Sequence, residues 1–204
     1  MAASLRLAFL SCATALALAG GCGRAPASDA APAASPPEAA AIGAVLLEGL
    51  GNHSFPVTSA VPEVQRWFDQ GLALTYGFNH DAAERAFLKA TELDPACAMC
   101  WWGASLVLGP HVNAAMDPAD AADAWARLQR ARELAPAASE REQAFIAALA
   151  ARYAADPPED RRPLDEAYAG AMRALAEQRP DDLDAAVLFA EAMIRWQPIR
   201  TWTR

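Results

Sequence analysis

Small and apolar residues recur at helical spacing from about residue 62 to the end of this 204-residue chain. The first two predicted helices carry them at fixed intervals: Trp67, Gly71, Leu74, Ala83, Phe87 and Ala90. Gly71 and Ala83 are small where two antiparallel helices must approach closely, and Trp67 and Phe87 fill the space beside them. The turn between the helices falls at residues 77–80. The pattern therefore predicts a helical hairpin.

The spacing of the second helix returns further along the chain. Intervals of four, three and five residues, which lead from Ala83 to Pro95, also separate a later set: Ala124, Leu128, Ala131 and Pro136. Each proline ends its helix, because it has no amide hydrogen to donate to the preceding turn. From Pro95 to Pro136 is 41 residues, and the residues in excess of a compact hairpin fall at 109–116. We expect a second hairpin with a long internal loop.

A third, degenerate unit pairs a helix at residues 139–154 with one at 164–177, separated by a loop at 156–163. It ends at Pro180, 44 residues after Pro136. Residues 184–196 form a further helix that no second helix follows. Since a repeat buries its apolar face only against its neighbours, this pattern predicts an unpaired C-terminal helix in a truncated array.

The intervals from Trp67 to Pro95 match the tetratricopeptide pattern, with departures at Gln70 and Leu74. Residues 53 to about 193 resemble a bacterial family of exported tetratricopeptide-repeat proteins in two runs, QGLALTYGFNH at 70–80 and DPACAMCWWG at 94–103. The resemblance implies an all-α solenoid of helical hairpins, with about three units plus the unpaired helix. It implies no reaction, because the role of the family is not established.

The N-terminus reads as an export signal. Residues 1–21 contain Arg6, a long apolar stretch and a small-residue run before Cys22, which resembles the cleavage site of bacterial lipoproteins. Cys22 is thus a candidate lipidation site and membrane anchor, although Ala19 stands where leucine is usual and ordinary cleavage near it is the alternative. Residues 22–40 are rich in Ala, Pro and Ser and predict a disordered tether. Residues 41–61 predict a leading segment with a short helix stopped by glycine.

The charge of the chain excludes one class of partner. Its net charge is −8, or −9 without residues 1–21, and Lys89 is its single lysine. Nucleic-acid binding requires many basic side chains to neutralise phosphates, so we expect no nucleic-acid partner. The export signal, and not the charge, predicts where the protein resides: it is expected in the periplasm, either free or anchored to the membrane through a lipid on Cys22.

The first helix of each unit predicts an apolar groove on the concave side of the solenoid. Its lining residues are expected to be Phe68, Leu72, Tyr76, Met99, Trp102 and Leu106. One interpretation is a groove for an apolar or aromatic peptide from a partner. The other is that the leading segment and further repeats cover this stripe, because an apolar helical stripe is usually part of a core.

Cys97 and Cys100 are the two cysteines expected in the folded domain, at the start of a helix. Residues three apart within a helix are too widely spaced for a disulfide, so closure requires Cys97 to occupy the non-helical cap position. A structural disulfide, a redox-active dithiol and a metal site are the alternatives, and the metal site would need His80 and His111 as further ligands. Trp101 stands where haem attachment requires histidine. We predict no cofactor and no metal.

Two functions follow from this sequence. The first is an exported tetratricopeptide-type scaffold that mediates protein–protein interaction in the cell envelope. The second is a thiol-dependent redox or metal-binding protein that uses Cys97 and Cys100. The unknown partner in the first case is a protein or a peptide, and we lean against an enzyme.

Overall fold

The computed structural model describes residues 44–196, and within them the chain folds into α-helices without any β-strand. The predicted signal peptide, Cys22 and the tether lie outside the described residues. The helices are α1 (Pro62–Tyr76), α2 (His80–Leu93), α3 (Ala98–Leu106), α4 (Ala121–Leu134), α5 (Glu140–Leu149), α6 (Arg162–Gln178) and α7 (Leu183–Trp196). Short 3₁₀ turns at Pro118–Asp120, Ala135–Ala137 and Ala150–Arg152 flank them.

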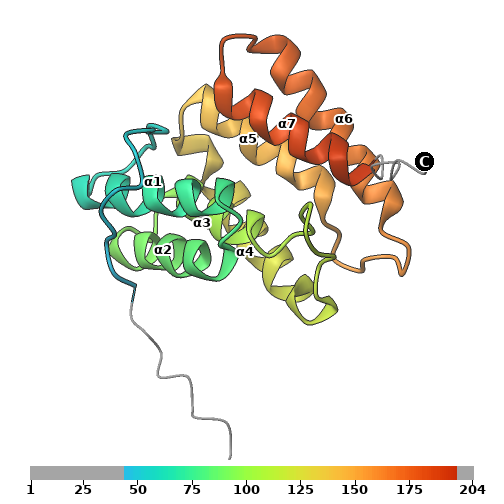
Figure 1. Cartoon of the computed structure of the whole chain (residues 1–204), viewed down its shortest axis with the longest axis horizontal. Coiled ribbons are helices and arrows are strands. Elements are labelled where there is room, and N and C mark those ends of the chain that lie inside the picture. Colours follow the sequence, from blue (N-terminus) through green and yellow to red (C-terminus); the bar gives the residue numbers. More distant parts are fainter. Residues whose placement is uncertain (1–43, 197–204) are drawn as a thin grey trace, which may run out of the picture. The chain divides into compact units, whose positions relative to one another are not determined.

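Consecutive helices pack as antiparallel pairs, α1 with α2, α3 with α4 and α6 with α7 (Figure 1). The turn predicted at residues 77–80 is present, because α1 ends at Tyr76 and α2 begins at His80. Asn79 caps α2, and its side-chain oxygen accepts a hydrogen bond from the amide of Ala82. The predicted all-α class is therefore confirmed.

Close helix approach depends on Gly71 and Gly103. A Cβ atom added to Gly71 would lie 2.7 Å from the ring of Phe87, and one added to Gly103 would overlap the same ring. Phe87 is fully buried between α1 and α3, the first helices of two successive hairpins. The two glycines therefore set how closely the first two hairpins stack.

Buried side chains from every helix form one continuous core. Polar contacts join the hairpins across it: the indole nitrogen of Trp102 donates to the carbonyl of Phe145 at 3.1 Å, and the Tyr153 hydroxyl donates to the carbonyl of Ser105 at 2.8 Å. Ser139 and Glu142 form a capping box that starts α5. None of the described helices is long and apolar enough to cross a membrane.

The C-terminal helix packs against its neighbour. Ala185, Leu188 and Ala192 of α7 are buried, and α7 lies along α6 in Figure 1. Its opposite face carries three exposed apolar residues: Leu183, Val187 and Ile194. The helix predicted at 184–196 is present. It packs against α6, the helix that precedes it in the chain.

Candidate functional site

Residues 44–61 cross the helices as an extended segment, which we call the strap. The short helix predicted for the leading segment is absent from these residues, where Gly49 and Gly51 adopt positive φ angles of 81° and 87°. Only Phe55 is buried within the strap. The strap is therefore held by the buried Phe55, by partly buried apolar side chains such as Leu46 and Val57, and by hydrogen bonds to the helices below it.

Two glutamines of α1 bind the strap backbone in the same way. The amide nitrogen of Gln70 donates to the carbonyl of Val45 at 2.8 Å, and its oxygen accepts from the amide of Leu47 at 2.7 Å. The side chain of Gln65 donates to the carbonyl of Phe55 at 2.7 Å and accepts from the amide of Val57 at 3.0 Å. Each glutamine thus pairs with a carbonyl and with the amide two residues later, as a neighbouring β-strand would.

The side chain of Phe55 enters an aromatic cage. Its ring centroid lies 5.5 Å from that of Phe68, 5.1 Å from that of Phe145 and 6.4 Å from that of Trp102. The guanidinium carbon of Arg141 lies 3.6 Å from the centroid of the Phe55 ring. Ring contacts and the cation together favour an aromatic side chain at this position.

Glu142 binds the strap three residues further on. Its carboxylate accepts from the amide of Thr58 at 2.7 Å and from the Thr58 hydroxyl at 2.5 Å, while it also caps the amide of Ser139 at 2.7 Å. Burial raises the pKa of Glu142, but these hydrogen bonds outweigh burial and bring the pKa below its usual value. Glu142 is therefore an ionised acceptor that requires donors from the strap.

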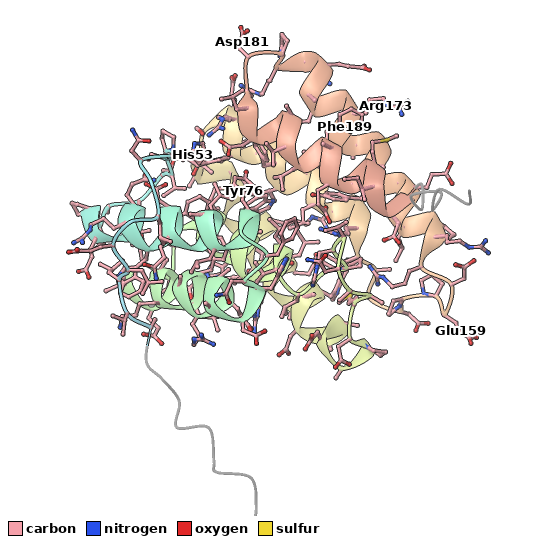
Figure 2. All side chains as sticks on the ribbon, in the orientation of Figure 1. His53, Tyr76, Glu159, Arg173, Asp181 and Phe189 are labelled. Atoms are coloured by element: carbon pink, nitrogen blue, oxygen red, sulfur yellow. A yellow bond between two sulfur atoms is a disulfide. The ribbon has the colours of Figure 1, made fainter. Side chains whose placement is uncertain are left out.

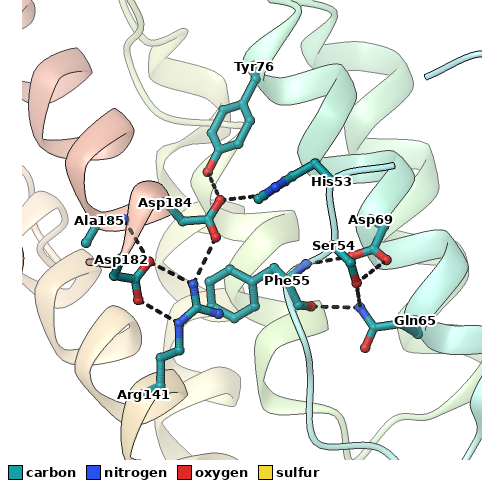
Figure 3. Close-up of polar contacts among 10 residues, drawn as sticks. All are labelled: His53, Ser54, Phe55, Gln65, Asp69, Tyr76, Arg141, Asp182, Asp184 and Ala185. Carbon is teal, nitrogen blue, oxygen red and sulfur yellow. Dashed lines mark hydrogen bonds and ion pairs between the residues drawn. The ribbon is translucent and has the colours of Figure 1, made fainter. Parts of the chain in front are cut away.

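Asp184 connects the strap, α1, α5 and α7 (Figure 3). Its carboxylate lies 2.8 Å from Nε2 of His53, accepts from the Tyr76 hydroxyl at 2.8 Å and accepts from the Arg141 guanidinium at 2.9 Å. Burial and the adjacent carboxylate raise the pKa of Tyr76, so Tyr76 stays a neutral donor. The Asp184 side chain is 5 % exposed, so its charge is compensated by its three neighbours and not by bulk water.

Asp182 extends the network through a bidentate contact. Arg141 donates to its two carboxylate oxygens at 2.6 and 2.8 Å. The hydrogen bonds from Arg141 lower the pKa of Asp182, and those to Asp182 and Asp184 hold the pKa of Arg141 above its usual value despite burial. Figure 2 shows Tyr76 and His53 on the side of α1 that faces α7, and Figure 3 shows Arg141, Asp182 and Asp184 beside them. The cluster stabilises the contact between the first and last hairpins.

The residues predicted to line a concave groove do not form an open surface. Phe68, Leu72, Met99, Trp102 and Leu106 are each at most 4 % exposed, and Tyr76 is half-buried beneath the Asp184 network. Phe55 packs directly on two of them. The leading segment therefore covers the stripe at Phe68 and Trp102, whereas Leu72, Met99 and Leu106 are part of the core.

Cys97 and Cys100 are joined by a disulfide, with their Cα atoms 5.4 Å apart. Cys97 is the cap of α3 and lies outside the helix in an extended conformation, as closure requires. Its sulfur also accepts from the amide of Cys100. Both residues are fully buried, so a redox partner could not reach the sulfurs without local opening.

His80 and His111 lie close together at the entrance of the loop after α3. Their rings stack with centroids 4.0 Å apart. Nδ1 of His80 lies 3.3 Å from the carbonyl of Val107, which can only accept, so the proton of neutral His80 resides on Nδ1. Burial lowers the pKa of His80. Between residues 44 and 196, no group of three or more His, Cys, Asp or Glu side chains is placed to bind a metal ion.

A small cavity opens beside α7, between it and the turn that follows α1. It has a volume of about 90 Å³, and its rim carries Phe78 and Val187, which are 51 % and 46 % exposed. Phe78 has a φ angle of 58° and is the only non-glycine residue with positive φ among those described. The buried part of its lining includes Leu106, Leu188 and Arg152.

Comparison with known proteins adds no identification. No family model, curated protein or solved structure matches this chain.

The strap-binding residues were not predicted as site residues. Gln70 stands where the tetratricopeptide pattern has leucine, and this departure was the one visible signal of its contact with the strap backbone. The Ser139-x-x-Glu142 spacing indicates a capping box, but it does not indicate that Glu142 also accepts hydrogen bonds from Thr58. Asp184 gave no signal, because its partners are distant in sequence: Tyr76 precedes it by 108 residues.

Proposed function

We propose that this protein is an exported scaffold of tetratricopeptide type that binds a partner protein in the bacterial cell envelope. Its stacked helical hairpins, with Gly71 and Gly103 in contact with Phe87, support the solenoid assignment. The Cys97–Cys100 disulfide supports export, because such bonds persist in oxidising compartments. Neither the hairpin stacking nor the disulfide indicates where on the surface a partner would bind.

Phe78 is the observation that carries the proposal. A left-handed backbone costs a bulky L-residue about 1–2 kcal/mol, and Phe78 has a φ angle of 58° while its ring is half exposed. Packing therefore does not explain why an aromatic residue occupies this position. Residues in strained conformations gather at ligand contacts, and aromatic side chains dominate the energy of protein interfaces.

Val187 and the adjoining cavity complete the proposed contact surface. Val187 projects from α7 onto the same rim as Phe78, and the cavity of about 90 Å³ has room for one apolar side chain of a partner. Exposed apolar groups around a recess are typical of protein interaction sites. The partner then inserts an apolar side chain between Phe78 and Val187.

The proposal is tested by crosslinking and capture from the envelope of the source bacterium. A photoreactive residue placed at Val187 should crosslink a defined protein, and Phe78→Asn should abolish the crosslink because asparagine tolerates the left-handed backbone but removes the ring. Leu47→Ala is the matched control, since Leu47 is also 51 % exposed but lies on the strap. Equal crosslinking in the Phe78→Asn and Leu47→Ala variants would reject this surface.

Export and lipidation have their own test. Radiolabelled fatty acid should be incorporated into the wild-type protein and not into a Cys22→Ser variant. Secretion of an unlabelled, cleaved wild-type protein would support ordinary cleavage near Ala19 in place of lipidation.

A further inference from the structure

The strap is bound as a peptide ligand would be bound. Most of its hydrogen bonds are made with helix side chains: Gln65 and Gln70 pair with its backbone, Asp69 and Glu142 accept from its amides and hydroxyls, and Asp184 contacts the ring of His53. It has no helix of its own and forms no strand ladder with another segment. Such contacts recognise an extended chain whichever molecule supplies it.

From these contacts we infer that the groove under residues 53–58 is a peptide-binding site, and that the strap is its exchangeable intramolecular ligand. The ligand taken in trans is an extended segment of another polypeptide with an aromatic residue three positions before a threonine or serine. This site is separate from the Phe78 surface of the proposed function, so each can fail without the other.

Sequence-independent affinity comes from the backbone contacts. Gln65 binds the carbonyl of Phe55 and the amide of Val57, while Asp69 accepts from the amide of Phe55 at 3.0 Å. These groups exist in any extended peptide, except that proline has no amide to donate at the positions of Phe55 and Val57. Pro56 stands between them, where no backbone amide is required.

Specificity comes from two side-chain subsites. The cage of Phe68, Trp102 and Phe145, closed by Arg141, accepts a planar ring. The ionised Glu142 accepts both the amide and the hydroxyl of Thr58, so an acidic residue there would be repelled and an apolar one would lose the hydroxyl hydrogen bond. The motif is therefore aromatic-Pro-x-Thr or a close relative of it.

The strap can be exchanged because little of it is buried. Phe55 is fully buried, whereas every other residue from 44 to 61 is partly or fully exposed. The His53 contact to Asp184 is partly exposed, since the His53 side chain is 44 % exposed although that of Asp184 is buried. Segments with few buried side chains open at a free energy below that of global unfolding. A peptide with the same motif then restores the contacts that the strap makes through Phe55, Val57 and Thr58.

The test uses the full chain and a labelled synthetic peptide with the sequence of residues 52–59. Phe55→Ala should bind this peptide at least tenfold more tightly than the wild type, by fluorescence anisotropy, because its own strap no longer fills the cage. The same peptide with alanine in place of its phenylalanine should not bind. Leu50→Ala is the control variant, since Leu50 belongs to the strap but is exposed outside the cage, and it should behave as wild type.

Folding of each variant is checked by helical circular dichroism. If Phe55→Ala does not fold, Thr58→Ala weakens the strap without a core vacancy and should still gain affinity for the peptide over wild type. A folded variant that binds the peptide no more tightly than the wild type does would overturn the inference. So would a concentration-dependent dimer of the wild-type chain that excludes the peptide, because the groove would then take the strap of a second copy.

Discussion

Arg141 lies over the ring of Phe55, with its guanidinium carbon 3.6 Å from the ring centroid. The same guanidinium donates to Asp182 and Asp184, so one side chain of α5 contacts both the strap and the start of α7. Segments from opposite ends of the described chain are thus stabilised through a single residue. Substitutions in the strap should consequently change the free energy of unfolding of the whole domain.

Phe55→Ala should lower the free energy of unfolding by about 3–5 kcal/mol, because it removes a fully buried ring from an aromatic cage. Urea denaturation followed by circular dichroism measures the change. Leu47→Ala, which truncates an exposed side chain of the same strap, should change stability by no more than about 0.5 kcal/mol. Equal effects of the two variants would mean that Phe55 does not hold the strap.

The stability of this domain should fall in acid partly through Glu142. Its folded pKa lies below its unfolded value near 4.5, so its contribution is complete above that pH and is lost as the pH falls through the folded pKa. Glu142→Gln should therefore reduce stability at pH 7 by about 1–3 kcal/mol, yet weaken the dependence on pH below about 4.5.

The measurement is denaturant unfolding of wild type and Glu142→Gln at several pH values between about 3 and about 7. Asp182, whose pKa is also lowered, retains its own share of the acid sensitivity in both proteins. Parallel stability curves for wild type and variant would contradict the assignment of this effect to Glu142.

Gly71→Ala should destabilise the domain by about 1–3 kcal/mol, because the new methyl group would lie 2.7 Å from the ring of Phe87. Combining it with Phe87→Leu should recover part of the loss, and a double-mutant cycle should give a coupling energy of about 0.5–3 kcal/mol. Gly170→Ala in α6 is the matched control. Apart from its chain neighbours and the backbone of its own helix, no atom lies within 4 Å of the added methyl group, so this change should be neutral or stabilising by up to about 1 kcal/mol.

The Cys97–Cys100 bond should resist reduction in the native protein, since both sulfurs are fully buried. Reduction by dithiothreitol, followed by thiol alkylation and mass spectrometry, should become fast only in denaturant. A double Cys→Ser variant should lose about 2 kcal/mol, the value expected for a short closed loop. Rapid reduction without denaturant would instead favour the redox function.

Local signals located the helices well. The turn at residues 77–80 and the non-helical cap at Cys97 each depend on a few neighbouring residues, so their geometry could be inferred from spacing alone. The conformation of the strap could not be inferred in this way. Its glycines and Leu46, Leu47 and Leu50 suggested a short helix, but Gln65 and Gln70 satisfy its backbone from outside, which removes the need for helical hydrogen bonds.

The sequence by itself determined the all-α class, the hairpin pairing around Gly71 and Phe87, and the candidate disulfide, because each depends on periodicity or short-range geometry. Only the tertiary structure decided that the expected groove holds Phe55 and that Asp184 joins His53, Tyr76 and Arg141. Those contacts join residues up to 131 positions apart. Pairings at such distances leave no periodic trace in a sequence, since they are selected by the packing of whole helices.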